Sequence, residues 1–579
     1  MKKMQIYSSS VIRKRLFAFL ILFAFLFILI FVRFFYLQII DRKKLLQLAT
    51  EQWTREVPVV ASRGNIVDRN GKIFANNQTA YSVFVRPNAV EDKEKTAESL
   101  ATLFGLDAAK LLEKMTGKKV SEITAVRHIS KAQVVKLEGQ KLSGVYYAKD
   151  NIRVYPFNNT LSQVLGFTSV DNVGLTGLEK YYDKFLRGIN GEIGYETDLI
   201  GVEIDGDFYY KPAVNGLNLQ LTIDYDIQVL AESALQKVYQ EYHPKSAQAI
   251  ILDPNTFDVL AMANYPTYNL NDIPRDDAEL LNQLARNKLV SDIYEPGSTF
   301  KVLTSAANIE EYIRGNPNAF APEHIFSDAR TRTVLGSTIK CWNEHKDGKH
   351  SHQTLADAIE NSCNPIFTDI ALALGKDKFY EYLQLFNYGA VTNIDFAGEA
   401  QGMILQKNMA TLADLARIAF GQTVAVTALQ LACATAAAIN GGYYYQPRLV
   451  QNIIDNTGNI HQKFTPILKN RTISEEASKM LRGYLEAVVE SGSGNKAFIE
   501  GYEVAGKTGT AQKFENGALA QGKYVSSFVG FFPARQPKYL ALVIVDEPQG
   551  AYYGSVVATP VVGEIFKGII DLKNIKPLK

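Results

Sequence analysis

Tyr294-Glu295-Pro296-Gly297-Ser298-Thr299-Phe300-Lys301 is the stretch around which the rest of the sequence is organised. A helix is expected to begin just after the Pro-Gly pair, which acts as a breaker. Ser298 and Lys301 are three residues apart, so they face one side of that helix and the amine can reach the serine oxygen. This pairing is typical of a serine nucleophile beside its base, and the free N–H groups of a helix start would stabilise the oxyanion.

The spacing alone does not single out Ser298, because about two Ser-x-x-Lys spacings are expected by chance in a chain of this length. Ser493-Gly494-Asn495-Lys496 repeats the spacing. That second segment lies in a Ser/Gly-rich run without apolar periodicity, which predicts a loop. The assignment of Ser298 therefore depends on other residues that join it.

Bulk composition describes a foldable chain with more than one domain. Its 579 residues exceed one ordinary core, and hydrophobic residues at 47% with charged residues at 21% argue against disorder. The net charge of +2 is not the strongly basic charge that is typical of nucleic-acid-binding proteins, so no nucleic-acid partner is expected. Only Cys341, Cys363 and Cys433 are present, which argues against a disulfide framework.

An uninterrupted apolar run occupies residues 16–32. At about 1.5 Å per residue it spans about 25 Å, and residues 34–37 extend it while Arg33 can snorkel to the interface. A cleaved signal peptide is the competing interpretation, but it calls for an apolar region of about 7–15 residues and a small-residue cleavage site. We therefore predict an uncleaved transmembrane anchor at residues 16–37 after a tail at residues 1–15.

Charge around the anchor predicts its orientation. The basic residues of the tail are Lys2, Lys3, Arg13, Lys14 and Arg15. They favour a cytoplasmic N-terminus, although Arg42, Lys43 and Lys44 soften the contrast. The chain is thus expected to be a single-pass protein of the cell membrane, with the remaining ~530 residues outside the cytoplasm.

Two segments follow the anchor. From Trp53 the pattern is strand-like with an Asn70-Gly71 hairpin turn, and short amphipathic helices follow at residues 87–150. Pro212, Asn215 and Gly216 interrupt the pattern, so we expect domains at residues 38–215 and 216–579. The second domain mixes strands and helices, including a buried strand at 539–545 and a closing helix at 556–570, which predicts an α+β or mixed α/β fold.

Arg63, Asp68 and Arg69 lie close together near that hairpin. They could bind an anion, but a buried structural ion-pair network is the favoured interpretation.

Two further clusters lie downstream of Ser298. Asn361-Ser362-Cys363-Asn364-Pro365 follows a short helical segment and offers a hydroxyl and an amide two residues apart. Lys507-Thr508-Gly509-Thr510 is strand-like, and its glycine would let a ligand approach the backbone closely. The order Ser-x-x-Lys, Ser-x-Asn, Lys-Thr-Gly is far beyond chance and is typical of serine enzymes that react with penicillin.

On these motifs the chain resembles the class B penicillin-binding proteins, most closely their septal and sporulation branch. Other matching segments are 63–64, 68–71, 177–179, 221–224, 294–297, 421–422, 429–430 and 505–512. The resemblance implies an α+β architecture: a single N-terminal transmembrane helix, an elongated mixed pedestal (dimerisation) domain at 38–215, and a transpeptidase domain at 216–579. That last domain would have an antiparallel sheet packed by helices, as in β-lactamases.

The activity that the resemblance implies is D,D-transpeptidation, in which Ser298 forms an acyl-enzyme and D-alanine is released. A serine hydroxyl is unreactive at neutral pH unless a base takes its proton. Lys301 can do so only if its pKa is lowered by desolvation or by a cationic neighbour such as Lys507.

Other roles are carried over from the family. Ser362 would relay a proton to the departing amine, and Asn364 would hold the amide of the donor peptide. Thr508, Gly509 and Thr510 would bind the terminal carboxylate beside the Lys-Thr-Gly lysine, with the backbone N–H groups of Thr510 and of the nucleophile as the oxyanion hole.

The implied partners follow from this activity. They are stem peptides that end in D-Ala-D-Ala, β-lactam antibiotics that mimic them, the membrane, a separate membrane glycosyltransferase, and proteins of the divisome or elongasome. The segment before the boundary shows no paired-carboxylate constellation, which disfavours a glycosyltransferase activity in this chain.

Metal is a separate hypothesis, because some members of this family carry zinc beside the active site with a cysteine of the middle motif as a ligand. Four residues fall where such ligands are expected: Asp328, Cys341, His350 and Cys363. His345 and His352 are nearby spares, and the spacings match no common finger pattern. The other interpretation is a buried Cys363 and exposed histidines on a hydrated loop. No cofactor is expected for catalysis itself.

Two other classes of function stay open. A β-lactamase or a membrane-bound β-lactam sensor would also be acylated at Ser298. The first needs a water-activating base that we cannot place, and the second needs a cytoplasmic output domain where only fifteen residues precede the anchor. A scaffold for other wall-synthesis proteins is the third hypothesis, but intact motif residues argue against a chain without activity.

Overall fold

The computed structural model describes residues 9–45, 54–117, 120, 122–196, 209–327, 330–342, 352–515 and 518–578. The chain divides into two compact units that interleave along the sequence. The first unit comprises residues 1–61, 79–151 and 189–214, and the second comprises 62–78, 152–188 and 215–579. Residue 215, where the sequence predicts a boundary, is thus one edge of the second unit. Residues 62–78 and 152–188 pack with that unit although they precede 215.

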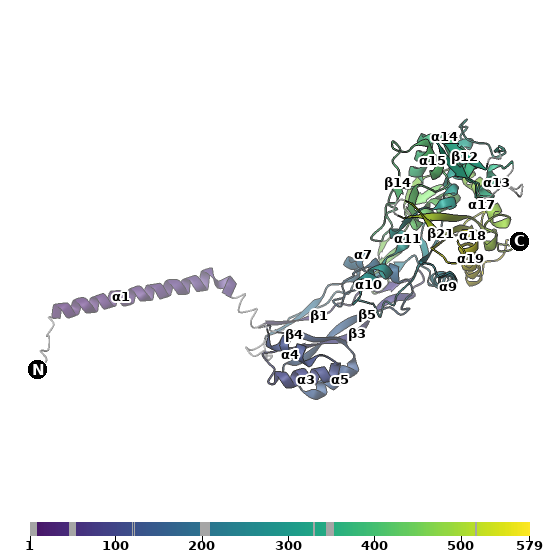
Figure 1. Cartoon of the computed structure of the whole chain (residues 1–579). Helices are drawn as coiled ribbons and strands as arrows, with labels where there is room; N and C mark the ends of the chain where they lie inside the picture. Colours follow the sequence, from purple (N-terminus) through teal and green to yellow (C-terminus); the bar gives the residue numbers. More distant parts are fainter. Residues whose placement is uncertain are drawn as a thin grey trace. The chain divides into compact units, whose positions relative to one another are not determined.

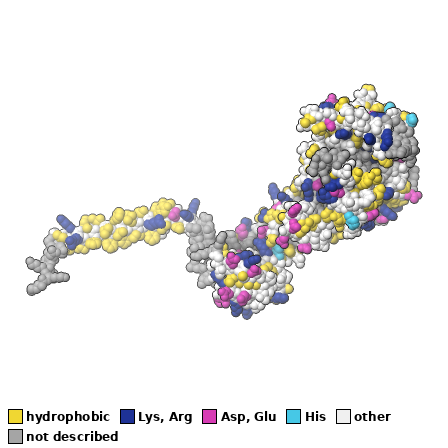
Figure 2. Space-filling model, viewed as in Figure 1, with side chains coloured by type: hydrophobic (Ala, Val, Ile, Leu, Met, Phe, Trp, Pro, Cys, Tyr) yellow, Lys and Arg dark blue, Asp and Glu magenta, His cyan; other side chains and the backbone are white. Residues whose placement is uncertain are grey.

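The N-terminal helix of the first unit is α1 (Ser9–Phe35), followed by a π-helical turn at Tyr36–Ile40 (Figure 1). Residues 10–40 form the one described helix that is long and apolar enough to cross a membrane. Its hydrophobic side chains are exposed, as Figure 2 shows. Since such a surface is unfavourable in water, it fits the predicted anchor.

The rest of the first unit contains strands and short helices. β1 (Thr54–Val59), β6 (Gly191–Glu196) and β7 (Tyr209–Lys211) form an antiparallel sheet. β4 (Ile123–Ile129) pairs with residues 81–85 of β3 (Ile73–Val85), and β5 (Val145–Val154) also pairs with β3. The accompanying helices are α3 (Lys93–Phe104), α4 (Ala108–Thr116) and α5 (Lys131–Gln140). Val83, Leu100, Leu111 and Val134 belong to their common core.

The second unit is built on a five-stranded antiparallel sheet in the order β10-β9-β22-β21-β20. Its strands are β9 (Ser246–Leu252), β10 (Val259–Tyr265), β20 (Ala505–Glu515), β21 (Ala518–Phe532) and β22 (Tyr539–Asp546). Both faces of β9 are buried: Ile251 packs into a core with α9 (Tyr225–Tyr242) and α19 (Thr559–Lys573), and Ile250 into the core of the helical region. The predicted strand at 539–545 is confirmed as β22, and the closing helix as α18 (Gly554–Val557) with α19.

The helical region lies on the other face of this sheet. Its central helix is α12 (Lys301–Ile313), whose residues 301–311 are all buried. The surrounding helices are α13 (Leu355–Glu360), α14 (Asn364–Leu385), α15 (Leu412–Ile418), α16 (Ala428–Ile439) and α17 (Glu475–Glu490). Small strands at its margins are β11 (Ile293–Tyr294), β12 (Thr331–Val334), β13 (Ser337–Lys340), β14 (Met403–Ile404), β15 (Val424–Thr427), β16 (Tyr443–Tyr445) and β19 (Leu468–Arg471).

Further elements complete the second unit. β8 (Asn218–Leu221) pairs with β2 (Ile66–Val67) and β17 (Val450–Ile454), and β17 also pairs with β18 (Ile460–Lys463). Short helices are α6 (Ser162–Leu165), α7 (Gly177–Tyr181), α8 (Asp183–Leu186), α10 (Ala278–Ala285) and α11 (Lys288–Ser291). The α+β architecture expected from the sequence is therefore present.

The predicted ion-pair network is confirmed for Arg63, whose fully buried side chain lies 2.6 Å from both Glu179 and Asp183. Arg153 joins the same Glu179 carboxylate at 2.7 Å. Asp68 has a different role, because its carboxylate accepts the backbone N–H groups of the Asn-Gly turn that follows it. Since removing one partner of a buried pair leaves an uncompensated charge, this network holds the start of the second unit in place.

Candidate active site

Ser298, the predicted nucleophile, lies on a 3₁₀ turn at Gly297–Phe300 that continues directly into α12. The prediction that a helix begins at the Pro-Gly pair is confirmed, with a tighter first turn than an α-helix has. Gly297 has φ +56° and donates its N–H to the carbonyl of Gly421 at 3.0 Å. A Cβ on Gly421 would stand 2.2 Å from the Gly297 oxygen, so glycine is required at that close approach.

Lys301 is fully buried at the start of α12, beneath the middle motif. Its Nζ donates to the carbonyl of Ser362 (2.7 Å), to Ser362 Oγ (3.1 Å) and to Asn364 Oδ1 (2.7 Å). Burial lowers the pKa of Lys301 to about 7, against an opposing effect of the Cys363 and Cys341 thiols. An amine with that pKa is partly neutral at physiological pH, which a general base requires.

No hydrogen bond between Ser298 Oγ and the Lys301 amine is found in the described part of the chain. The direct contact expected from their spacing therefore stays a prediction. Catalytic hydrogen bonds are often long in ligand-free enzymes and tighten only when substrate is bound.

Ser362 lies in the turn between α13 and α14, 61 residues beyond Lys301 in sequence. Its φ of +58° is rare for a residue other than glycine, and such backbone strain concentrates at functional sites. Asn364 begins α14, and its Nδ2 donates to the Lys340 carbonyl of β13 at 3.2 Å. Pro365 is in the first turn of α14, where a missing N–H has no cost.

Lys507 comes from β20 and reaches the same serine. Its Nζ donates to Ser362 Oγ at 3.1 Å, and its side chain is fully buried. Burial, and then the charge of Lys301, lower the pKa of Lys507 well below the usual value for lysine. One serine hydroxyl thus receives hydrogen bonds from two lysines that are more than 200 residues apart in the sequence.

The residues after Lys507 form the edge of the sheet beside the nucleophile. A Cβ at Gly509 would lie 2.4 Å from Ser527 Oγ and 2.9 Å from the side chain of Thr299. A glycine at position 509 is therefore needed for packing as well as for ligand approach, because the segment that carries Ser298 packs against it. Thr510 Oγ1 accepts the N–H of Gly554 at 2.9 Å, so its own proton is free to face a ligand.

Ser493, which the sequence interpretation left in a loop, contacts the candidate site. Its Oγ lies 2.9 Å from Thr508 Oγ1, within the Lys-Thr-Gly strand. The predicted loop at residues 493–496 is confirmed as a turn that enters a short 3₁₀ segment at Asn495–Ala497. Small polar residues in a loop carry no local signal of such a contact, so only the fold brings this serine to the site.

The four predicted metal ligands are not brought together in full. Cys341 and Cys363 are buried, and their thiols are hydrogen-bonded to each other, which together with burial raises the pKa of Cys363. Asp328, His350 and the spare His345 lie outside the described residues, and His352 is exposed. The described ranges contain no group of three or more His, Cys, Asp or Glu side chains suited to a metal. Two thiols alone do not make a zinc site, so zinc stays a prediction.

Carboxylates are not part of the hydrogen-bonded centre. In the described ranges, no Asp or Glu side chain is hydrogen-bonded to Ser298, Lys301, Ser362 or Lys507. The centre therefore consists of hydroxyls, amines and an amide, which can transfer protons during acyl transfer.

Comparisons with known proteins identify the family of this chain. The penicillin binding protein transpeptidase domain matches residues 247–567, and the penicillin-binding protein dimerisation domain matches residues 58–221. The chain is similar to stage V sporulation protein D of Bacillus subtilis, with 38% identity covering 99% of this chain and 88% of that protein. It is 29% identical to peptidoglycan D,D-transpeptidase FtsI of Escherichia coli, over 94% of this chain and 89% of that protein.

The fold has counterparts among solved structures. A peptidoglycan synthetase from Bifidobacterium adolescentis matches with a TM-score of 0.73 and 26% identity, covering 90% of this chain and 97% of that one. The three motifs converge in the domain that the transpeptidase family model matches, and the dimerisation domain precedes it. The chain therefore belongs to the class B penicillin-binding proteins.

Proposed function

We propose that this chain is a serine D,D-transpeptidase that cross-links the stem peptides of peptidoglycan. The observation that carries the proposal is the pair of hydrogen bonds from Lys301 and Lys507 to Ser362 Oγ. These hydrogen bonds connect Lys301, the proposed base, to Lys507, whose strand would bind the substrate carboxylate. Membership of the family and the name of the Escherichia coli relative support the same reaction.

Acylation begins when neutral Lys301 takes the proton of Ser298 as its oxygen attacks the carbonyl carbon of the penultimate D-alanine. The resulting oxyanion would be held by the backbone N–H groups of Ser298 and Thr510. One such donor is often worth about 10²–10³-fold in rate. The lowered pKa of Lys301 is what makes the first proton transfer feasible near neutrality.

The acyl-enzyme forms when the amide bond breaks and D-alanine leaves. Its departing amine must gain a proton, and Ser362 Oγ can pass one from a lysine ammonium because both amines donate to it. The amine of a neighbouring stem peptide then attacks the ester and restores the Ser298 hydroxyl. Deprotonation of that acceptor amine returns the proton to the same lysine and serine relay.

Substrate binding falls to the residues around this relay. Asn364 would hold the donor peptide amide, since its Oδ1 and Nδ2 are already oriented by Lys301 and Lys340. Thr508 and Thr510 would donate their hydroxyls to the terminal carboxylate, with Lys507 behind them as the cation. Gly509 keeps this strand close to the nucleophile. β-Lactams would acylate Ser298 as mimics of the D-Ala-D-Ala terminus.

The proposed compartment is supported by α1, which is long and apolar enough to cross a membrane. With the basic tail in the cytoplasm, both domains lie outside it, where peptidoglycan is assembled. A transpeptidase of this kind needs glycan strands to join, so a membrane glycosyltransferase and division or elongation proteins are the proposed partners. Zinc near Cys341 and Cys363 is a structural hypothesis only. Fewer than about 0.2 zinc ions per correctly folded chain would exclude it.

The decisive experiment is acylation of the purified full chain by fluorescent penicillin, with wild type compared to Ser298→Ala. Wild type is expected to be labelled and to retain the label, whereas the variant is expected to stay unlabelled. Equal labelling of both would rule out Ser298 as the nucleophile. Rapid release of the label would favour a β-lactamase, and normal cross-linking in cells that carry only the variant would favour a scaffold.

A further inference from the structure

Ser362 is held in an uncommon backbone conformation by hydrogen bonds on both of its sides. Its φ of +58° lies in the left-handed region. The carbonyl of Ser362 itself accepts a hydrogen bond from Lys301 Nζ at 2.7 Å. The carbonyl before it, that of Asn361, accepts one from the indole Nε1–H of Trp342 at 2.8 Å. Each of the two peptide groups that flank Ser362 is therefore fixed by a side chain from a different segment.

The hydrogen bond from Trp342 restrains the φ angle of Ser362. Because a peptide group is planar, the direction of the Asn361 carbonyl and φ of Ser362 change together. Half a turn of that plane would take φ of Ser362 from +58° to about −120°, which most residues adopt readily. A left-handed φ is unfavourable for serine, so the turn would relax in that direction if the carbonyl were released. The indole N–H opposes this relaxation.

The segment that carries Trp342 contacts the same turn at other points. It follows β13, and the Lys340 carbonyl at its start accepts a hydrogen bond from Asn364 Nδ2 at 3.2 Å. Between these two residues, the thiols of Cys341 and Cys363 are hydrogen-bonded to each other. Three successive residues thus each meet the middle motif, so this segment supports the turn along its length.

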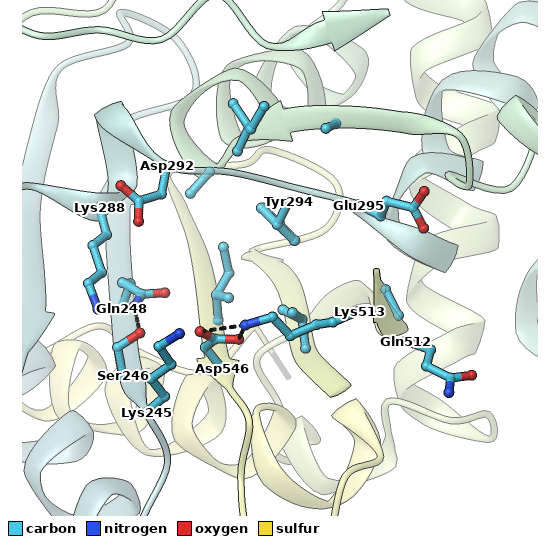
Figure 3. Close-up of a pocket in the computed structure, with 16 residues that line it drawn as sticks. Lys245, Ser246, Gln248, Lys288, Asp292, Tyr294, Glu295, Gln512, Lys513 and Asp546 are labelled. Carbon is cyan, nitrogen blue, oxygen red and sulfur yellow. Dashed lines mark hydrogen bonds and ion pairs between the residues drawn. The ribbon is translucent and has the colours of Figure 1, made fainter. Parts of the chain in front are cut away.

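The exposure of Trp342 argues against a role in core packing. This residue is 60% exposed, whereas a tryptophan that stabilises a core buries most of its ring. Trp342 is also not part of the cavity of about 430 Å³ in the second unit, whose lining includes Lys245, Tyr294 and Gln512 (Figure 3). The hydrogen bond to the Asn361 carbonyl therefore accounts for this tryptophan better than burial of its ring does.

We propose that Trp342 is a positioning residue for Ser362, whose hydroxyl passes protons in the proposed transpeptidation. Trp342 acts by holding the Asn361 carbonyl. Ser362 Oγ then stays 3.1 Å from the amines of Lys301 and Lys507. A misplacement of about 1 Å can cost a reaction about 10²-fold in rate. This inference rests on the proposed function, because it requires that Ser362 carries a proton.

The first test compares Trp342→Phe with wild type, using the full chain in detergent micelles. Phenylalanine keeps an aromatic ring and removes the N–H donor. Labelling by fluorescent penicillin at several concentrations separates the limiting rate constant of acylation from the half-saturating concentration. We expect the rate constant to fall about 2–10-fold, the value of one neutral hydrogen bond, and the half-saturating concentration to stay within about twofold. An unchanged rate constant, with or without weaker binding, overturns the proposal.

A double-mutant cycle tests whether Trp342 acts through Ser362. Ser362→Ala alone is expected to slow acylation, and adding Trp342→Phe to it should slow the reaction by less than about twofold more. A tryptophan with a merely structural role would slow acylation by the same factor in both backgrounds, and that result also overturns the proposal. Unfolding in denaturant checks that each variant is folded.

Two further variants complete the experiment. Leu335→Ala is the matched control, because Leu335 is 72% exposed in the turn between β12 and β13, and it should leave the rate within about twofold. Ser298→Ala separates this inference from the proposed function, since labelling that persists in Ser298→Ala refutes the nucleophile itself. Labelling that is lost in Ser298→Ala but keeps its rate in Ser362→Ala or Trp342→Phe would leave the nucleophile in place and reject the positioning role alone.

Discussion

The two Ser-x-x-Lys segments, Ser298–Lys301 and Ser493–Lys496, share a spacing but differ in the burial of the lysine. Lys301 is fully buried and donates three hydrogen bonds, whereas Lys496 is exposed on a short turn. Burial lowers the pKa of Lys301 to about 7. The comparison shows that burial, and not the spacing, distinguishes the lysine that we propose as the base.

Replacing each lysine in turn is expected to give the largest difference in acylation rate between the two segments. Lys301→Met should slow acylation by penicillin about 10²–10⁴-fold, because the general base is removed. Lys496→Met should leave the rate within a factor of about two, since an exposed side chain away from the site contributes little. Acylation rates from stopped-flow or gel labelling measure both. Comparable losses in the two variants would contradict the contrast.

The pH dependence of acylation sharpens the same contrast. Only neutral Lys301 can accept the serine proton, so the rate should fall about tenfold per pH unit below about pH 7 and level off above it. Burial disfavours the ammonium form of Lys301 and so lowers its pKa. The neutral amine, which is the active form, is therefore present at lower pH than in an ordinary lysine. Lys496→Met should show the same fall in acylation rate below about pH 7. A rate constant unchanged between pH 5.5 and 8 would show that Lys301 is not the base.

A third prediction concerns the packing that only the first segment has. Gly509→Ala would place a Cβ 2.4 Å from Ser527 Oγ, 2.9 Å from the Thr299 side chain and 3.1 Å from the Pro296 oxygen. We expect the free energy of unfolding to fall by about 1–3 kcal/mol, and acylation to slow by about tenfold or more as Ser298 shifts.

Gly483→Ala is the matched control for that substitution, because nothing lies within 4 Å of its added Cβ in helix α17. It should stabilise the protein by about 0.5–1 kcal/mol through helix propensity and leave acylation unchanged. Denaturant unfolding and penicillin labelling give the two readouts. Equal stability changes in both variants would mean that the close packing around Gly509 is unimportant.

Local patterns predicted much of this fold and part of the site. The run at 16–32 predicted α1, and the apolar stretch at 539–545 predicted the central strand β22, because burial imposes a visible periodicity or run of residues. Ser298, Ser362 and Lys507 were found because each lies in a recognisable motif. Periodicity predicts that a side chain is buried, but it does not predict which residue that side chain contacts.

What escaped prediction depends on contacts between distant segments. The bridge from Lys301 and Lys507 to Ser362 joins three elements, and the contact between Ser493 and Thr508 joins a loop to a strand. The interleaving of the two units is of the same kind, since residues 62–78 and 152–188 pack with later segments. None of these contacts can be predicted from the composition of a single segment of the sequence.

Ser493 gives the smallest expected effect and the finest test of the comparison. Its hydroxyl supports Thr508 at 2.9 Å and is not a nucleophile in this scheme. Ser493→Ala should therefore keep labelling by penicillin and slow acylation by about 2–10-fold, the value of one neutral hydrogen bond. Ser493→Thr, which keeps a hydroxyl, should recover most of the rate. Loss of labelling as complete as in Ser298→Ala would instead give both serines a direct role in the reaction, and burial of the lysine would no longer explain which segment is catalytic.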